Sequence, residues 1–333
     1  MPRPLLRVAI IEWITGGGCL GEPLPPGLAA EGRLMADGLA GELVEGGCGV
    51  MLCRDPRAGP VQHGVETFPV QGPRPPWRLW ERALAGCDLF WPIAPETGGA
   101  LEALARLGRR HGGAVVASDS ASLRITASKR RTSHVLRQAG LPAVETVPAG
   151  APWPASAAGW VVKPDDGAGA LGVRRVRGRC ALPEEEAAGL VVQPWLPGAP
   201  SSLSLLCAAG KARLLACNRQ LVRERPDGSL AFEGVEVGGA EERRVVLEPL
   251  AMAIAAALPG LFGPVGVDLV DGPQGPVVLE INPRLTTAWV GLAAALGRPP
   301  GPLVLDLLRR GLDAVPPLRP CRVVPVLPER SHG

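Results

Sequence analysis

The sequence of 333 residues contains no tyrosine, and aromatic residues make up only 4% of it. The core must therefore be built from Leu, Val, Ile and Ala, in a chain that is 46% hydrophobic. No apolar run reaches the roughly 18 residues that a membrane helix needs. The N-terminus lacks the charged and apolar regions of a secretion signal. We therefore expect a cytoplasmic protein without a membrane partner, long enough for two or three domains.

The cysteines and histidines form no recognisable reactive set. The eight cysteines contain no CxxC pair, and the four histidines are scattered. This pattern argues against a zinc site, a disulfide framework and a histidine-based triad. The net charge of +3 is small, and the arginine runs at 130–131 and 174–179 lack interleaved aromatic residues. We interpret these runs as solvated surface and expect no nucleic-acid partner.

Lysine and asparagine are also scarce. Only Lys129, Lys163 and Lys211 occur among 35 basic residues, and the only asparagines are Asn218 and Asn282. A chain so biased toward arginine keeps lysine where a compact, flexible point charge is needed. This scarcity marks Lys129, Lys163 and Asn282 as candidates for a functional site.

The order of expected elements predicts an α/β protein whose second half is α+β. Strands and helices alternate through residue 117, which indicates a small parallel sheet. The strands of this part are expected at 7–14, 50–53, 88–92 and 114–117, and its helices at 27–45, 77–85 and 98–110. A helix capped by Asp119 or Ser122 should then extend to residue 138. Later strands are expected at 144–147, 160–164, 173–176 and 191–194 and in a hairpin at 202–222, with helices at 248–258, 288–296 and 303–311 and an extended tail from 315.

A glycine-rich loop, TGGGCLG at 15–21, follows the first strand and formally contains G-x-G-x-x-G. We reject a dinucleotide fingerprint, because three prolines at 23, 25 and 26 prevent a helix from opening at the third glycine. A loop at the carboxyl end of such a strand still lines a crevice in an open α/β sheet. A plain connection is the alternative. The candidate substrate contacts of this loop are Glu12, Gly16, Gly17 and Gly18.

The stretch at 264–287, PVGVDLVDGPQGPVVLEINPRLTT, predicts two strands joined by a Gly/Pro turn. Glu280 and Asn282 are two residues apart and point to one side of their strand. If the strands pair, Asp268 joins them, giving three oxygen ligands of the kind that Mg²⁺ prefers. Arg284 follows, where its planar cation could bind the same anion. The alternative is a solvated hairpin with its polar residues facing outward.

A second cluster of candidates precedes this stretch. Lys163 ends an apolar strand and leads into DDGAGALG at 165–172, whose glycines would let backbone N–H groups approach phosphate oxygens. It is not a Walker A loop, since the lysine precedes the glycines. A surface hairpin is the alternative. About 30 residues on, VVQPWLPG could hold a flat base between backbone hydrogen bonds and the side chains of Trp195 and Leu196.

This ordered set resembles the ATP-grasp superfamily over roughly residues 118–300. The resemblance implies an N-terminal parallel-sheet domain (1–117), a small ATP-grasp subdomain (118–197) and a large one with a C-terminal tail (198–333). It implies that ATP and Mg²⁺, or Mn²⁺, are the cofactors. In that pattern Arg284 and Lys163 serve catalysis, and Asp268, Glu280 and Asn282 hold the metal. The implied ATP contacts are Lys129, Lys163, Gly167, Gly169, Gly172, Gln193, Trp195 and Leu196.

One departure from the family concerns the ribose, because Pro200 stands where a carboxylate is expected. Ser201, Ser202 or another residue would have to replace it. The stretches EWITGGG, CNRQ and EINPRLTT are most similar to the tyramine–L-glutamate ligase type of methanofuran biosynthesis. The resemblance implies an ATP-dependent ligase acting on an amino acid and an amine, and leaves a homodimer open. A ligase with another acceptor and a non-catalytic ATP-binding regulator are the alternatives. Further candidate substrate contacts are Asn218, Arg219, Thr286 and Thr287.

Overall fold

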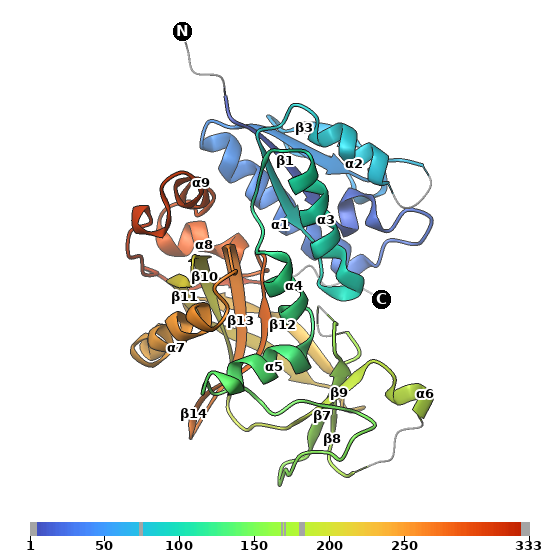
Figure 1. Cartoon of the computed structure of the whole chain (residues 1–333), viewed down its shortest axis with the longest axis vertical. Helices are drawn as coiled ribbons and strands as arrows, with labels where there is room; N and C mark the ends of the chain where they lie inside the picture. Colours follow the sequence, from blue (N-terminus) through green and yellow to red (C-terminus); the bar gives the residue numbers. More distant parts are fainter. Residues whose placement is uncertain (1–4, 73–75, 168, 170, 180–183, 328–333) are drawn as a thin grey trace.

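The part of the chain that the structure describes is organised around three β-sheets, with helices packed against them (Figure 1). This computed structural model describes residues 5–72, 76–167, 169, 171–179 and 184–327. The first sheet is parallel, and the other two are antiparallel. The fold is therefore the expected α/β arrangement with an α+β second half. Each sheet lies within one of the segments 1–117, 118–197 and 198–333, which we retain as a proposed domain division.

The first sheet has the strand order β3-β2-β1-β4-β5. Its strands are β1 (Arg7–Glu12), β2 (Gly49–Arg54), β3 (Glu66–Pro69), β4 (Leu89–Ile93) and β5 (Ala114–Val115). The helices between them are α1 (Pro26–Glu45), α2 (Trp77–Leu84) and α3 (Ala100–Arg110). Side chains of β1 alternate between two cores. Val8 and Ile10 pack in the core that contains α1, while Ala9 and Ile11 pack in the core that contains α2 and α3.

The glycine-rich loop after β1 does not open a helix. Residues Ile14–Gly18 form a single π-helical turn, and α1 begins only at Pro26. This is the arrangement that the prolines predict, because proline is tolerated at the first position of a helix and not in its interior.

The second half contains a small sheet and a large sheet, in the orders β6-β9-β7-β8 and β14-β13-β10-β11-β12-β15. The small sheet contains β6 (Val147–Pro148), β7 (Trp160–Pro164), β8 (Arg174–Val176) and β9 (Leu190–Pro194). The large sheet contains β10 (Ala199–Ala208), β11 (Lys211–Glu224), β12 (Leu230–Val237), β13 (Gly263–Gly272), β14 (Gly275–Asn282) and β15 (Val324–Val326). The helices are α4 (Ser120–Thr126), α5 (Lys129–Gln138), α6 (Glu184–Ala187), α7 (Arg244–Ala257), α8 (Trp289–Leu296) and α9 (Gly301–Arg310).

The first and the large sheet share one hydrophobic core. Helix α1 packs against α8 and α9, and the ring of Trp91 on β4 meets Trp289 on α8 edge-on, with 6.0 Å between their centroids. Such an aromatic pair adds roughly 0.5–1.5 kcal/mol to the area it buries. This packing holds α1 next to the large sheet. Within the described ranges, no helix combines the length and the apolar character needed to cross a bilayer.

Several local expectations differ from the structure. The helix expected to reach residue 138 is two helices, because Ser128 caps α5 by accepting a hydrogen bond from the Arg131 N–H. Helix α7 starts at Arg244, four residues before its expected start, and contains Pro249 in its sixth position. Strands β3, β12 and β15 were not expected as strands. The edge strands β3 and β15 pair with β2 and β12 across longer stretches of sequence, which local patterns do not reveal. Strand β12 lies inside the large sheet and forms a short hairpin with β11, which sequence reasoning missed.

Candidate active site

A pocket of about 270 Å³ lies between the small and the large sheet. Strands β7 and β9 line one side, and strands β10 to β14 line the other. Helix α5 contributes Lys129, helix α1 contributes Glu31, and the segment after β14 contributes Arg284, Thr286 and Thr287. Apolar side chains and a few charged groups therefore converge on one concave site, which is typical of a ligand pocket.

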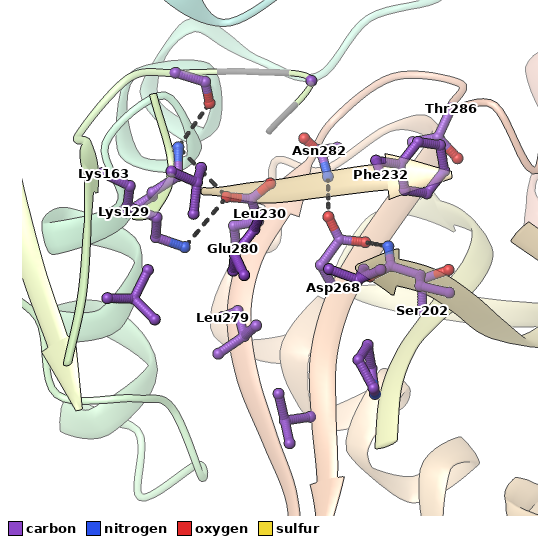
Figure 2. A pocket seen from close by; sticks show the side chains of 18 of the residues that line it. Lys129, Lys163, Ser202, Leu230, Phe232, Asp268, Leu279, Glu280, Asn282 and Thr286 are labelled. Atoms are coloured by element: carbon purple, nitrogen blue, oxygen red, sulfur yellow. Dashed lines mark hydrogen bonds and ion pairs between the residues drawn. The ribbon is translucent and has the colours of Figure 1, made fainter. Parts of the chain in front are cut away.

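The charged centre of the pocket is Glu280, which lies between two lysines (Figure 2). Its Oε2 atom is 3.3 Å from Lys129 Nζ and 3.7 Å from Lys163 Nζ. Strands β13 and β14 pair as expected, with Asp268 opposite Glu280. Asn282 Nδ2 donates to Asp268 Oδ2 at 3.1 Å, and Gln220 Nε2 donates to Asp268 Oδ1 at 2.7 Å. The hairpin thus brings Asp268, Glu280 and Asn282 together at the wall of the pocket.

Burial changes the protonation of this cluster. Burial and the adjacent Glu280 carboxylate raise the pKa of Asp268. Burial alone would also raise the pKa of Glu280, but Lys129 and Lys163 outweigh it and the pKa is lowered. Burial lowers the pKa of Lys163 to about 8, although Glu280 opposes this shift. Two neighbouring carboxylates repel each other when both are ionised, and an added cation would favour the ionised form of both.

The side-chain oxygen atoms of Asp268, Glu280 and Asn282 are ligands of the kind that Mg²⁺ prefers. Among the described residues, no cluster of three His, Cys, Asp or Glu side chains could hold a metal ion. Asp268 and Glu280 provide two carboxylates, and Asn282 keeps its amide oxygen because its amide nitrogen faces Asp268. Mg²⁺ is usually bound by one or two carboxylates and completes its octahedron with water and phosphate oxygens. The donor set is thus suited to a metal that arrives with a phosphate ligand.

The glycine-rich loop after β7 is attached to the start of α5. Lys129 Nζ donates to the Gly167 carbonyl at 2.7 Å, and Asp165 accepts from the Ser128 hydroxyl and the Arg130 N–H. Gly167 and Gly169 line the pocket, whereas Gly172 is not among its lining residues. Gly169 has a φ of 67°, in the left-handed region that favours glycine. The loop therefore brings backbone groups and Lys129 to the same end of the pocket.

Another part of the pocket wall is mainly apolar. Gln193, Trp195 and Leu196 line it together with Val161 and Leu279. Gln193 Nε2 donates to Thr146 Oγ1 at 3.0 Å, which leaves the amide oxygen as an acceptor. An acceptor beside apolar walls suits the exocyclic amine of a flat base.

The pocket lining helps to identify which residue could bind the ribose in place of the carboxylate that Pro200 replaces. Pro200 and Ser202 line the pocket. Ser201 is buried, and its hydroxyl donates to the Ala199 carbonyl at 3.2 Å. Of the two serines, Ser202 is thus the candidate for a ribose contact.

Arg284 is held by residues of the N-terminal half. Its Nη2 atom donates to Glu96 Oε2 at 3.1 Å, and Glu96 follows strand β4. Glu31 of α1 accepts a hydrogen bond from the Thr287 hydroxyl. Burial alone would lower the pKa of Arg284, but the carboxylates of Glu96, Glu31 and Glu280 raise it. The guanidinium therefore lies among three acids, two of which come from the first 100 residues.

The remaining predicted substrate contacts lie away from the pocket lining. Glu12 is buried, and its carboxylate accepts from the N–H groups of Ile14 and Thr15 and from the Thr15 hydroxyl. Asn218 is buried as well, and it donates to the hydroxyls of Ser202 and Ser204. These contacts are structural, and a substrate role stays a prediction for each residue.

The glycine turn at 16–18 and Arg219 also lie away from the pocket lining and make structural contacts. Gly16, Gly17 and Gly18 are buried in the π-helical turn, and the Gly16 carbonyl accepts from the Trp80 indole. Arg219 has a half-exposed side chain, 3.4 Å from Glu242 and 3.8 Å from Glu236. A surface ion pair thus accounts for Arg219. Substrate contacts from these residues also remain predictions.

Sequence reasoning missed Glu31, Glu96 and Gln220. Gln220 lies two residues after Asn218, in the CNRQ stretch that the resemblance had already singled out. Glu96 follows the carboxyl end of a parallel strand, the edge at which α/β sheets bind ligands, and this rule could have found it. No local signal marks Glu31, which is one of several acids on helix α1, with Asp37, Glu42 and Glu45.

Comparisons with known proteins agree with this architecture. An ATP-grasp domain family matches residues 126–288, and a pre ATP-grasp 3 domain family matches residues 48–123. Tyramine–L-glutamate ligase from Methanocaldococcus jannaschii is 32% identical over 102 residues. This match spans 31% of the chain and 31% of that ligase, so the chain matches less than a third of its curated relative.

Solved structures show the same fold over nearly the whole chain. A putative ATP-grasp superfamily protein from Archaeoglobus fulgidus has a TM-score of 0.70 at 23% identity, covering 90% of this chain and 88% of that one. L-amino acid ligase from Bacillus licheniformis has a TM-score of 0.68 at 18% identity, covering 95% and 78%. At these identities the likeness shows the fold. Together with the two domain matches and the pocket between the sheets, it establishes that the chain belongs to the ATP-grasp superfamily of ligases.

Proposed function

We propose that the chain is an ATP-dependent ligase that joins L-glutamate, or another amino acid, to tyramine or a similar amine. The observation that carries the proposal is the convergence of Lys129, Lys163 and Arg284 on one pocket that also presents Asp268, Glu280 and Asn282. Cations beside an oxygen-ligand set are the arrangement that a metal–nucleotide complex requires. The partial identity to tyramine–L-glutamate ligase supports the choice of substrates.

In this proposal ATP lies along the pocket with its base near Gln193. The Gln193 amide oxygen accepts from the adenine amine, while Trp195 and Leu196 border the ring. Lys129 and Lys163 bind phosphate oxygens, and the glycine loop covers them with backbone N–H groups. Mg²⁺ or Mn²⁺, bound by Asp268, Glu280 and Asn282, would supply positive charge to the phosphate oxygens.

The reaction would proceed in two steps without a covalent enzyme intermediate. A carboxylate oxygen of the amino acid attacks the γ-phosphorus, the bond to the ADP oxygen breaks, and an acyl phosphate forms. The amine nitrogen then attacks the acyl carbon, phosphate leaves with the electrons of the C–O bond, and the nitrogen loses a proton. The chain contributes position and charge, which is the usual mode of phosphoryl-transfer catalysis.

The part of the pocket near Arg284 has groups that suit an amino acid substrate. Arg284 and Glu31 border this part with Thr286 and Thr287. In this proposal Arg284 binds the transferred γ-phosphate, a carboxylate close by complements the ammonium group of the amino acid, and the threonine hydroxyls offer further hydrogen bonds. Glu31 would bind the substrate ammonium group, since the Thr287 hydroxyl bonds only its Oε1 atom.

The test is ADP release by the purified protein with MgATP, L-glutamate and tyramine, each omitted in turn. We expect release that needs all three, together with a product of the mass of glutamyl-tyramine. Release with glutamate and a different amine would keep the mechanism and change the acceptor. MgATP binding without ADP release for any amino acid and amine would contradict the ligase and favour a non-catalytic ATP-binding protein.

A further inference from the structure

A buried ion pair connects the N-terminal half of the chain to the pocket. Glu96 is 6% exposed, and the Arg284 side chain is 13% exposed. The pair is held at two points, with Nη2 donating to Oε2 at 3.1 Å and with Nε lying 3.1 Å from Oε1 without hydrogen-bond geometry. The two residues are 188 positions apart in sequence. A pair so buried and so distant in sequence fixes the guanidinium relative to the N-terminal sheet.

The contacts of Arg284 leave part of its donor capacity for a ligand. A guanidinium carries five N–H donors in a rigid plane. Glu96 occupies the edge formed by Nε and Nη2, and Nη1 donates to the Leu285 carbonyl at 3.3 Å. The remaining N–H groups are available to an anion in the pocket that Arg284 lines. Glu96 thus determines which edge of the guanidinium is left for the ligand.

Arg284 has competing carboxylate partners close by. Glu31 and Glu280 both act on its charge, and both line the same pocket. Without Glu96 the guanidinium would be drawn toward one of them. In either position it would occupy space and charge that the ligand needs. The ion pair with Glu96 keeps the arginine out of these alternative pairings.

The turn that carries Glu96 also contacts the segment that leads into the glycine loop. Thr97 Oγ1 donates to the Asp166 carbonyl at 2.7 Å, and the Gly98 N–H donates to Asp166 Oδ2 at 3.1 Å. Gly98 and Gly99 have φ values of 62° and 71°, so this turn requires residues that tolerate the left-handed region. One turn therefore contacts the arginine through Glu96 and the start of the loop through Thr97 and Gly98.

We propose that Glu96 is a positioning residue that holds Arg284 in the orientation required to bind the transferred phosphate. The turn at 96–99 thereby sets the arginine relative to the glycine loop. This inference rests on the proposed function, because it takes Arg284 as the arginine at the transferred phosphate. It concerns one residue of the N-terminal half that no motif assigns.

The first test is the Glu96→Gln variant, which keeps the shape of the side chain and removes its charge. We expect kcat for ADP release to fall about 10²-fold, as a small misplacement of a catalytic group does. Affinity for MgADP should stay within about two-fold of the wild type. Glu96→Asp, which keeps the charge, should restore part of kcat. The matched control is Glu66→Gln on β3, whose exposed ion pair with Arg7 measures 3.3 Å and lies outside the pocket lining.

A binding measurement tests Glu96 without turnover. The ratio of affinities for a non-hydrolysable MgATP analogue and for MgADP isolates the contacts to the γ-phosphate. We expect Glu96→Gln to lower this ratio about 10-fold, the usual effect of one charged hydrogen bond. In an Arg284→Ala background the same substitution should change the ratio by less than two-fold, because a positioning residue acts only through its partner.

The outcomes separate the two proposals. A wild-type protein that releases no ADP with any acceptor would contradict the proposed function, while the affinity ratio would still test Glu96. An unchanged kcat and ratio in Glu96→Gln would overturn the positioning role. Equal losses of ATP-analogue and ADP affinity with a lower melting temperature, or additive effects of the two substitutions, would also overturn it, since each indicates a general structural role.

Discussion

The Glu280→Gln variant should weaken the dependence of ATP binding on magnesium. Glu280 Oε2 lies 3.3 Å from Lys129 Nζ and 3.7 Å from Lys163 Nζ. At an effective dielectric constant of about 20, each of these attractions amounts to roughly 5 kcal/mol before the cost of desolvation. Removing one partner of a buried pair costs about 3–5 kcal/mol of stability, because the other charges stay buried. The ligand-free variant should therefore melt well below the wild type.

A polyphosphate should compensate for the missing carboxylate. In the variant the two lysines have no anion between them, so ATP without metal should bind more tightly than it does to the wild type. One of the three proposed metal ligands is gone, so Mg²⁺ should add less to ATP affinity. The rate of ADP release should fall about 10²–10³-fold, which is typical for the loss of an oriented charge contact.

Calorimetric titration of ATP with EDTA and then with MgCl₂ measures these changes. The titration should be made well below pH 8, because the wild-type pKa of Lys163 is about 8 and the loss of the Glu280 carboxylate lowers this pKa further. The control is Glu233→Gln, which removes an acid from the surface pair with Arg223. A Glu280→Gln protein with the wild-type magnesium dependence and rate would refute the assignment of Glu280 to both the metal and the lysines.

Three further variants test other parts of the site and fold. Lys163→Ala should lower the rate of ADP release about 10²–10³-fold, whereas Lys211→Ala, at an exposed position of β11, should leave the rate unchanged. Glu31→Gln should raise the KM for the amino acid about 10-fold and leave the KM for ATP unchanged; equal changes in both would contradict an ammonium contact. Burial raises the pKa of Glu42 to about 8, so the folded state loses stability as the pH rises from about 4.5 to 8. Each unit of such a shift amounts to about 1.4 kcal/mol, less what water screens at this partly exposed carboxyl. Glu42→Gln should therefore raise the melting temperature at pH 8 and not at pH 4.5, unlike Glu45→Gln at the exposed end of α1.

The hairpin of β13 and β14 that carries the proposed metal ligands could be predicted because its geometry is local. Side chains two residues apart on a strand share a face, and a Gly/Pro turn brings the partner strand into register. Glu280 and Asn282 therefore had to lie together, and Asp268 joined them once β13 and β14 paired. Lys129 and Lys163 could be selected without any structure as well, because lysine is rare in this chain. Their roles in binding ATP remain proposals.

The glycine turn after β1 shows where local reasoning reached its limit. Its position at the carboxyl end of a parallel strand predicted a pocket contact for Glu12 and for Gly16 to Gly18. In the structure Trp80 of α2 binds the Gly16 carbonyl, and α1 packs over Glu12, so the turn is buried beneath these helices. Which loops of an α/β sheet stay open depends on the helices that cover them.

The sequence by itself determined the class of the fold, the order of the motifs and the hairpin that carries Asp268, Glu280 and Asn282, because strand alternation and turn chemistry act over a few residues. Only the tertiary structure decided that Glu31 and Glu96 of the N-terminal half reach the same pocket. Their positions depend on the packing of α1 against α8 and α9 and on the ion pair between Glu96 and Arg284. Such contacts join segments far apart in the chain, and their energy comes from burying complementary surfaces, which no short stretch of sequence encodes.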